Sequence, residues 1–256
     1  MEVEQIKESA ERHNSIMLAL YRHRQGVYRI LRNRFGYSRR RTGSDILLAL
    51  AEVSEVEPAV AKACRSAAER ATLIAEVEKM FTEENRSAMA YAERALMTSD
   101  SLEKAINNLS DMRKQVKENS GLTIGLDLAI EIARSGEKTI YNSEFMVKFL
   151  NEGQNGKEEF APEGRGFIED VFAQANADLE GAIYGAVAGA QSASIFGIAS
   201  WIGAAAVGES FALLGSAEVA WRNMAKFGNI RVIHGPNDPN GPIYWPPVDP
   251  DDRPIT

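Results

Sequence analysis

The feature that most constrains this chain is an uncharged run at residues 181–208, GAIYGAVAGAQSASIFGIASWIGAAAVG. It lies between Glu180 and Glu209 in a chain of 256 residues, of which 25% are charged. A helix needs roughly 20 predominantly apolar residues to span a bilayer, and no other part of the sequence reaches that length. The run therefore predicts either a helix buried inside a bundle or a segment that enters a membrane.

Small residues recur at every fourth position of the run, which gives a helix a groove almost free of side chains. This is the pattern by which packed membrane helices approach each other closely. Glycine costs roughly 0.8–1 kcal/mol relative to alanine in a helix, so its repetition indicates close backbone packing. The residues predicted to serve helix packing and membrane insertion are Gly181, Gly185, Gly189, Ala193, Ile195, Phe196, Gly197, Ile198, Trp201 and Ile202.

The apolar content of the run makes its insertion marginal. At roughly 0.3–0.6 kcal/mol for each large apolar residue, the run favours the bilayer by only about 2–4 kcal/mol. We therefore expect a helix buried on all sides to be the resting state in water. A second apolar run, FALLGSAEVAW, follows Glu209, and a bend near Gly203 or Gly208 would make a short helical hairpin.

The rest of the chain has helical periodicity and predicts an all-α bundle of long helices. Apolar residues from Val3 to Leu31 follow steps of three and four, as in a coiled-coil seam that ends near Gly36. In LTIGLDLAIEIA, at residues 122–132 and just beyond, alternation would also suit a strand. An isolated strand has no partner, so we favour a helix there.

Start signals divide the bundle into helices. Ser44 is predicted to cap a second helix, and Pro58 to open a third that runs unbroken to Met97. Ser99 or Ser101 is predicted to cap the next helix, which continues to about Gly121.

Composition shifts suggest four regions. They are an N-terminal helical bundle at 1–150, a charged glycine-rich loop or hinge at 151–166, a hydrophobic glycine-rich helical region at 167–227, and an extended proline-rich tail at 228–256. In the tail, Tyr244, Trp245, Pro246 and Pro247 form an aromatic-proline cluster. That cluster suits either docking to a partner or folding back onto the bundle.

An arginine-rich segment at residues 21–41 carries eight arginines and no acidic residue. They are Arg22, Arg24, Arg29, Arg32, Arg34, Arg39, Arg40 and Arg41. Arginines interleaved with aromatics suit anionic lipid headgroups, an acidic partner or nucleic acid. The simplest interpretation is a solvated face that pairs with acidic helices of the same chain. The net charge of −7 makes nucleic acid the least favoured of these partners.

Several classes of site are not indicated. The single cysteine, Cys64, excludes an internal disulfide framework and is expected to be buried on a helix. The three histidines lack metal-ligand spacing, and no catalytic motif occurs, so we expect no enzyme activity, cofactor or metal. The acidic, polar N-terminus predicts synthesis in the cytoplasm without a cleavable signal peptide. Delivery to a membrane would need another route.

Residues 181–215 resemble the glycine-rich hydrophobic hairpin of α-helical pore-forming toxins, including the colicin type, in composition and glycine spacing. The resemblance implies a bundle that conceals a membrane-inserting hairpin near its C-terminus. It transfers no functional residues, and the long proline-rich tail departs from that class.

Two functions follow from these patterns. The leading one is a membrane-inserting, pore-forming or permeabilising protein whose hairpin is concealed, with membrane lipid and further copies of the chain as partners. The alternative is a non-enzymatic structural or interaction protein. It would oligomerise through its glycine-rich helices and dock partners through its arginine-rich segment and tail.

Overall fold

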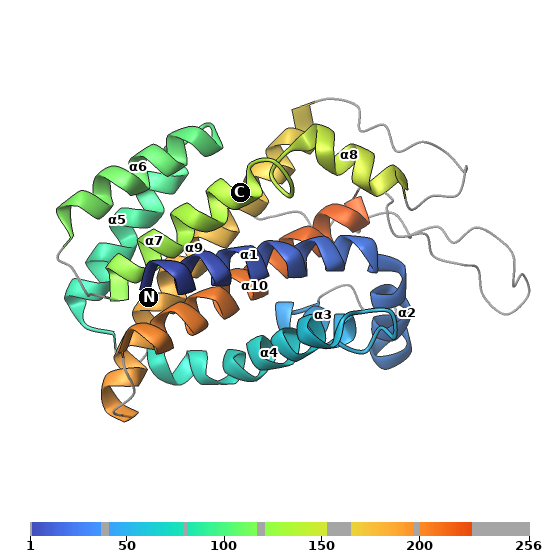
Figure 1. Cartoon of the computed structure of the whole chain (residues 1–256), viewed down its shortest axis with the longest axis horizontal. Coiled ribbons are helices and arrows are strands. Elements are labelled where there is room, and N and C mark those ends of the chain that lie inside the picture. The colour runs from blue at the N-terminus through green and yellow to red at the C-terminus, as the bar shows by residue number, and fades with distance from the viewer. Residues whose placement is uncertain are drawn as a thin grey trace, which may run out of the picture.

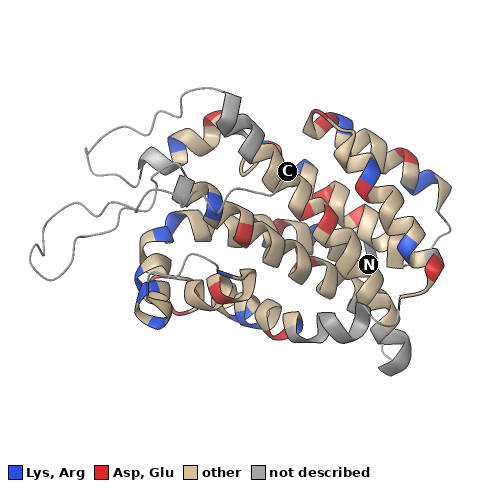
Figure 2. Cartoon of the chain, turned by 180° about the vertical axis from the view of Figure 1, so that it is seen from behind, with Lys and Arg blue, Asp and Glu red and all other residues tan. Residues whose placement is uncertain are grey.

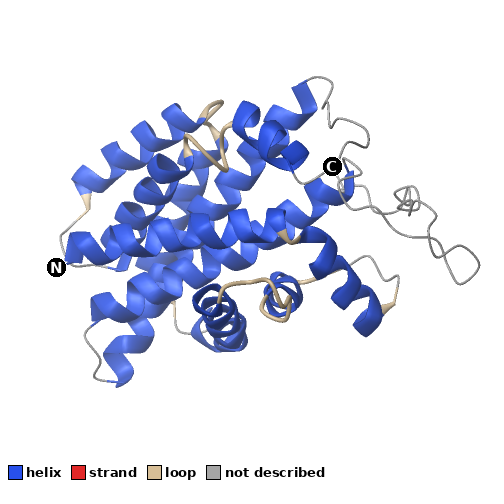
Figure 3. Cartoon of the chain, turned by 45° about the vertical axis from the view of Figure 1, so that its right-hand side comes forward, coloured by secondary structure: helices blue, strands red, loops and turns tan. Residues whose placement is uncertain are grey.

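The computed structural model describes residues 2–36, 41–78, 81–116, 121–152, 165–196 and 200–226. Side chains are described within these ranges except at residues 2, 72–78, 84, 150–152, 165–170, 192–196, 200–203, 225 and 226. The described chain is all-α, which confirms the predicted fold class (Figure 3). The proline-rich tail lies outside the described residues.

Ten helices follow one another in the described ranges. They are α1 (Glu2–Arg22), α2 (Arg24–Phe35), α3 (Gly43–Leu50), α4 (Pro58–Glu78), α5 (Glu83–Met97), α6 (Leu102–Gln115), α7 (Gly121–Gly136), α8 (Ser143–Glu152), α9 (Arg165–Phe196) and α10 (Ser200–Lys226).

Helices α9 and α10 pair along their length as a hairpin in the middle of the bundle (Figure 1). Helix α7 packs against α9, and α1 lies across α7 and α10. Helices α3 and α4 contact α10, while α5 contacts α9 and α6 contacts α7. The hairpin is therefore covered by helices from the N-terminal half of the chain.

The core consists mainly of two apolar clusters. The first joins α1–α4 to α10 and includes Leu20 and Leu213. The second joins α5, α6, α7 and α9 and includes Leu128 and Leu179. Because α10 contributes Leu213 to the first cluster and Ala212 to the second, the hairpin lies between them.

Two of the predicted helix N-termini are confirmed and one is wrong. Pro58 opens α4, and Ser101 caps α6 by accepting a hydrogen bond from the Lys104 amide, as predicted. The predicted cap at Ser44 is wrong. Thr42 caps α3 instead, through a reciprocal capping box with Asp45.

Three predicted helix bounds are also wrong. The single helix expected through Met97 is divided into α4 and α5, because Thr82 caps a new helix by accepting from the Asn85 amide. The N-terminal seam is not one helix, because it breaks at His23 between α1 and α2, although it ends at Gly36, the C-cap of α2, as predicted. Helix α6 ends at Gln115, and Gly121 begins α7 rather than ending the helix before it.

The ambiguous segment at 122–132 is helical within α7, as we favoured. The hairpin bend is elsewhere than predicted, because α10 runs without a break through Gly203 and Gly208. The uncharged run is divided instead at residues 197–199, which lie outside the described residues. Ala204, Ala205 and Ala206 lie between the two glycines and favour the helix, so glycine alone does not end it.

Candidate functional site: the α9–α10 hairpin

The glycines of α9 bring it into backbone contact with α10. A Cβ atom added to Gly185 would lie 2.7 Å from the Val207 carbonyl oxygen and 2.9 Å from the Gly208 Cα. A Cβ atom on Gly181 would lie 2.8 Å from the Phe211 carbonyl oxygen. Real Cβ atoms do not approach backbone so closely, so the α10 backbone fills the groove of α9 within the same chain.

Helix α7 approaches α9 in the same way from another side. A Cβ atom on Gly125 would lie 2.8 Å from the Ile183 Cα, and one on Gly121 would lie 2.6 Å from the Ala190 Cβ. These two glycines had not been singled out in the sequence, although their spacing of four is the same as that of Gly181 and Gly185. Helix α9 is therefore enclosed by small residues of both α7 and α10.

Of the other residues predicted to serve helix packing and membrane insertion, the structure describes only one in full. Gly189 is buried on α9. The side chains of Ala193, Ile195, Phe196, Trp201 and Ile202 are not described, and Gly197 and Ile198 lie outside the described residues. The tail cluster of Tyr244, Trp245, Pro246 and Pro247 lies outside them too.

Helix α1 is attached to its neighbours by a set of polar contacts that we term the polar seam. It consists of Arg12, His13, Asn14 and Tyr21 of α1, their partners Ser135, Gln174, Asp178 and Glu209, and Tyr141, which donates to Asp178. The partners of α1 come from α7, α9 and α10, so the polar seam joins the covering helix α1 to both helices of the hairpin.

The first contact of the polar seam is a bidentate ion pair between Arg12 and Glu209. Arg12 Nε donates to Glu209 Oε1 at 2.6 Å, and Arg12 Nη2 donates to Glu209 Oε2. The Glu209 side chain is 6% exposed, whereas that of Arg12 is 48% exposed. Water therefore reaches the arginine, while the carboxylate depends on it for neutralisation.

The second contact is a fully buried His–Asp pair. His13 Nε2 lies 3.7 Å from Asp178 Oδ1, and neither atom has a hydrogen-bond partner among the described residues. His13 Nδ1 lies 2.9 Å from Asn14 Oδ1, and Tyr141 donates its hydroxyl to the second Asp178 oxygen. Burial alone would lower the pKa of His13, but Asp178, Asn14 and Glu209 together outweigh it, and the net shift of the pKa is upward.

The remaining contacts extend the polar seam along α1. Asn14 Nδ2 donates to Ser135 Oγ at 2.6 Å, and Tyr21 donates its hydroxyl to Gln174 Oε1. A second covering helix, α4, adds Arg70, whose Nη1 donates to Ser210 Oγ at 2.8 Å.

Buried ion pairs and polar networks add little net stability compared with apolar packing of the same volume. The cover over the hairpin is therefore held partly by contacts whose strength depends on ionisation and on access of water. These residues were missed in the sequence, where the histidines were considered only as metal ligands or as part of the helical periodicity. The available signal was that Asp178 and Glu209 are acidic residues close to the two ends of the uncharged run.

The arginine-rich segment is only partly an internal pairing face. Arg24 is buried and donates to the Tyr21 carbonyl, Arg22 lies over the Phe149 ring, and Arg34 pairs with Glu52. Arg41 lies over Phe35 and donates to the Gly36 carbonyl. Arg39 and Arg40 lie outside the described residues.

The side chain of Arg29 is exposed and that of Arg32 half-buried on α2, and neither side chain has a hydrogen-bond or ion-pair partner among the described residues. Figure 2 shows basic residues close together on this helix. Cys64 is fully buried, as predicted, and burial raises the pKa of its thiol to about 12.

Comparison with protein-family models, with curated proteins and with solved structures gives no match. In the part of the chain that the structure describes, no helix is both long enough and apolar enough to cross a membrane. In the same part, no group of three or more His, Cys, Asp or Glu side chains is arranged to hold a metal ion.

Proposed function

We propose that this chain is a membrane-inserting, permeabilising protein that stores its uncharged run as the central hairpin of a helical bundle. The observation that carries the proposal is the polar seam. An uncharged run that served only as permanent core would suit apolar packing on every side. Here Asp178, within one turn before the run, and Glu209, directly after it, both contact the covering helix α1.

Insertion would require α9 and α10 to separate. At 1.5 Å per residue, the uncharged part of α9 from Gly181 to Phe196 is about 24 Å long, and that of α10 from Ser200 to Gly208 is about 14 Å long. The hydrocarbon core of a bilayer is about 30 Å thick. The run reaches that length only when its two arms join into one helix, which breaks the contacts at Gly181 and Gly185.

A second copy of the chain could bind the glycine groove of α9 only after α9 and α10 separate. In the resting bundle, the α9 groove at Gly185 is filled by the backbone of α10. Assembly through the glycine-rich helices would therefore follow opening rather than precede it. This ordering favours the membrane function over an assembly protein that oligomerises through free glycine grooves.

The test is an aspartate placed where the bundle tolerates it and the bilayer does not. Ala190 is half-buried, lies about a third of the way along the run and faces Gly121, the first residue of α7. An anion beside the N-terminus of a helix is favourable by about 0.3–1 kcal/mol. At bilayer depth, an aspartate costs about 2.5–3.5 kcal/mol, as much as the whole driving force estimated for insertion.

We therefore expect Ala190→Asp to keep its thermal midpoint and to lose dye release from vesicles of phosphatidylcholine and phosphatidylglycerol. The matched control, Ala190→Asn, has nearly the same size without the charge and should retain most of the release. Equal dye release by the wild type and Ala190→Asp would count against insertion of the run.

A further inference from the structure

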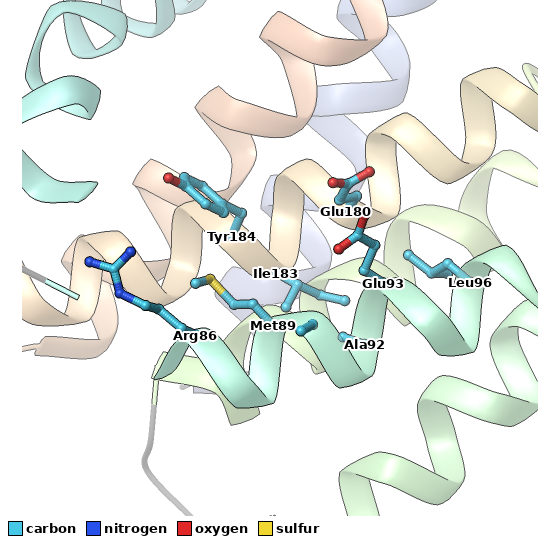
Figure 4. Close-up of a pocket in the computed structure, with 9 residues that line it drawn as sticks. Arg86, Met89, Ala92, Glu93, Leu96, Glu180, Ile183 and Tyr184 are labelled. Atoms are coloured by element: carbon cyan, nitrogen blue, oxygen red, sulfur yellow. The ribbon is translucent and has the colours of Figure 1, made fainter. Parts of the chain in front are cut away.

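A groove with a volume of about 240 Å³ lies between the covering helix α5 and the hairpin helix α9. Its walls are apolar, formed by Met89 and Leu96 of α5 with Ile183 of α9, and Tyr184 lies beside them (Figure 4). Met97, which is 75% exposed, follows one turn after Glu93 on the same face of α5. The helices thus leave an open apolar surface rather than closing it.

Two carboxylates face each other across this groove. Glu93 of α5 and Glu180 of α9 lie close together in Figure 4 and are both solvent-exposed. Neither has a hydrogen-bond or ion-pair partner among the described residues. Partial burial of its carboxyl, together with the negative charge of Glu93, raises the pKa of Glu180. The two carboxylates therefore repel each other across the groove.

The nearby arginine does not neutralise them. Arg86 lies at the other end of the groove, two helical turns from Glu93, and its Nε donates to the Phe81 carbonyl at 3.4 Å. A metal ion is a poor match for the same place, because Mg²⁺ and Ca²⁺ need many oxygen ligands and these walls are hydrocarbon. The complementary ligand carries one positive charge and an apolar body.

We infer that the α5–α9 groove binds a small organic cation, an aryl- or alkyl-ammonium, with its charge between Glu93 and Glu180. The apolar body lies on Met89, Leu96 and Ile183. Such a ligand would link a covering helix to a helix of the hairpin and would stabilise the closed bundle by mass action. The inference does not depend on membrane insertion, since the groove exists in the resting fold.

The probe is phenethylammonium, titrated into the full-length protein in the absence of membranes and followed by chemical-shift changes and by thermal midpoint. For a ligand of this size in an open groove, we expect saturation with a Kd of about 1 mM. Phenethyl alcohol has the same body without the charge and should bind at least tenfold more weakly. Binding should weaken as the pH is lowered through the raised pKa of Glu180, because protonation removes the attraction.

Two variants and one control locate the site. Glu93→Gln/Glu180→Gln removes both charges and should weaken phenethylammonium binding at least tenfold. Because the two carboxylates repel each other, this variant should melt no lower than the wild type. Ala90→Trp fills the groove from an exposed position of α5 and should also abolish binding, whereas Glu103→Gln on the exposed face of α6 should leave it unchanged. Absence of saturable binding, or equal binding by the double variant, would overturn the inference.

Discussion

Arg12 of α1 donates two hydrogen bonds to Glu209 of α10, although the two residues are 197 positions apart in the chain. Glu209 directly follows the uncharged run, so this ion pair joins one end of the run to the covering helix α1. Glu209 has lost nearly all contact with water, so its charge is tolerated only while Arg12 is present.

Arg12→Ala should therefore lower the free energy of unfolding by about 2–3 kcal/mol, since it leaves a buried carboxylate unpaired. Urea denaturation measures this loss. Arg134→Ala is the control, because Arg134 pairs with Glu131 at the surface of α7 and should cost no more than about 0.5 kcal/mol. If Arg12→Ala/Glu209→Gln does not recover part of the loss, the buried charge is not its cause.

The His13–Asp178 pair should make stability depend on pH. The folded-state pKa of His13 is raised, so the folded protein binds a proton more tightly than the unfolded chain does. The stability that His13 contributes is present below its unfolded pKa of about 6.5 and is lost as the pH rises through the raised pKa. We expect the urea midpoint to fall as the pH rises above about 6.5, a fall that is removed in His13→Gln.

His23 provides the comparison for this experiment. It is partly buried next to Arg22, and both effects lower its pKa, so its contribution to the slope has the opposite sign. The same fall with pH in wild type and in His13→Gln would exclude the buried pair as its source.

The glycine contacts predict a contrast between two positions of the hairpin. Gly185→Ala would place a Cβ atom 2.7 Å from the Val207 carbonyl oxygen, and neither backbone can yield easily. We expect a loss of about 1–3 kcal/mol, measured by thermal denaturation. Gly215 of α10 has its nearest neighbour at 3.4 Å, so Gly215→Ala should be neutral or should stabilise by up to about 1 kcal/mol. Equal destabilisation by Gly185→Ala and Gly215→Ala would mean that close contact with the α10 backbone is not the reason for a glycine at position 185.

Substitutions of arginines on α2 can distinguish a role in binding an anionic surface from a role in stabilising the fold. Arg29→Gln/Arg32→Gln should weaken binding to anionic vesicles at low salt and leave the melting temperature unchanged, because each arginine near such a surface contributes about 1 kcal/mol. Arg24→Gln should instead lower the melting temperature, since Arg24 is buried and donates to the Tyr21 carbonyl. Cosedimentation across a salt series measures the first effect. Binding that does not change with salt or with the double substitution would remove the lipid role of α2.

Much of the fold was predictable because helical periodicity is a local signal. The helix at 122–132 and the starts at Pro58 and Ser101 depend on residues within one or two turns. The break at Thr82 was missed because the alanine-rich sequence around it suits a helix on both sides. The bend predicted near Gly203 or Gly208 is wrong because these glycines were taken as breaks, whereas α10 continues through them.

The polar seam was not predictable from the sequence. Its partners, such as Arg12 with Glu209 and Asn14 with Ser135, are more than a hundred residues apart, and no spacing rule brings them together. The glycine spacing of α9 indicated that a backbone would approach. It did not identify the partner, because α7 and α10 both carry small residues that fit.

The central claim is that α9 and α10 must separate before the chain permeabilises a membrane, and a reversible crosslink tests it most directly. A Cβ atom on Gly215 would lie 4.0 Å from the Ala177 Cβ, within the 3.5–4.5 Å that a disulfide requires. Ala177→Cys/Gly215→Cys, made in a Cys64→Ala background so that no other thiol is present, should join the two helices on oxidation. We predict that the oxidised protein releases no dye from anionic vesicles and that a reductant restores release to the level of the Cys64→Ala parent. Dye release by the oxidised protein at the rate of the reduced one would contradict the account, because the hairpin would then act without opening.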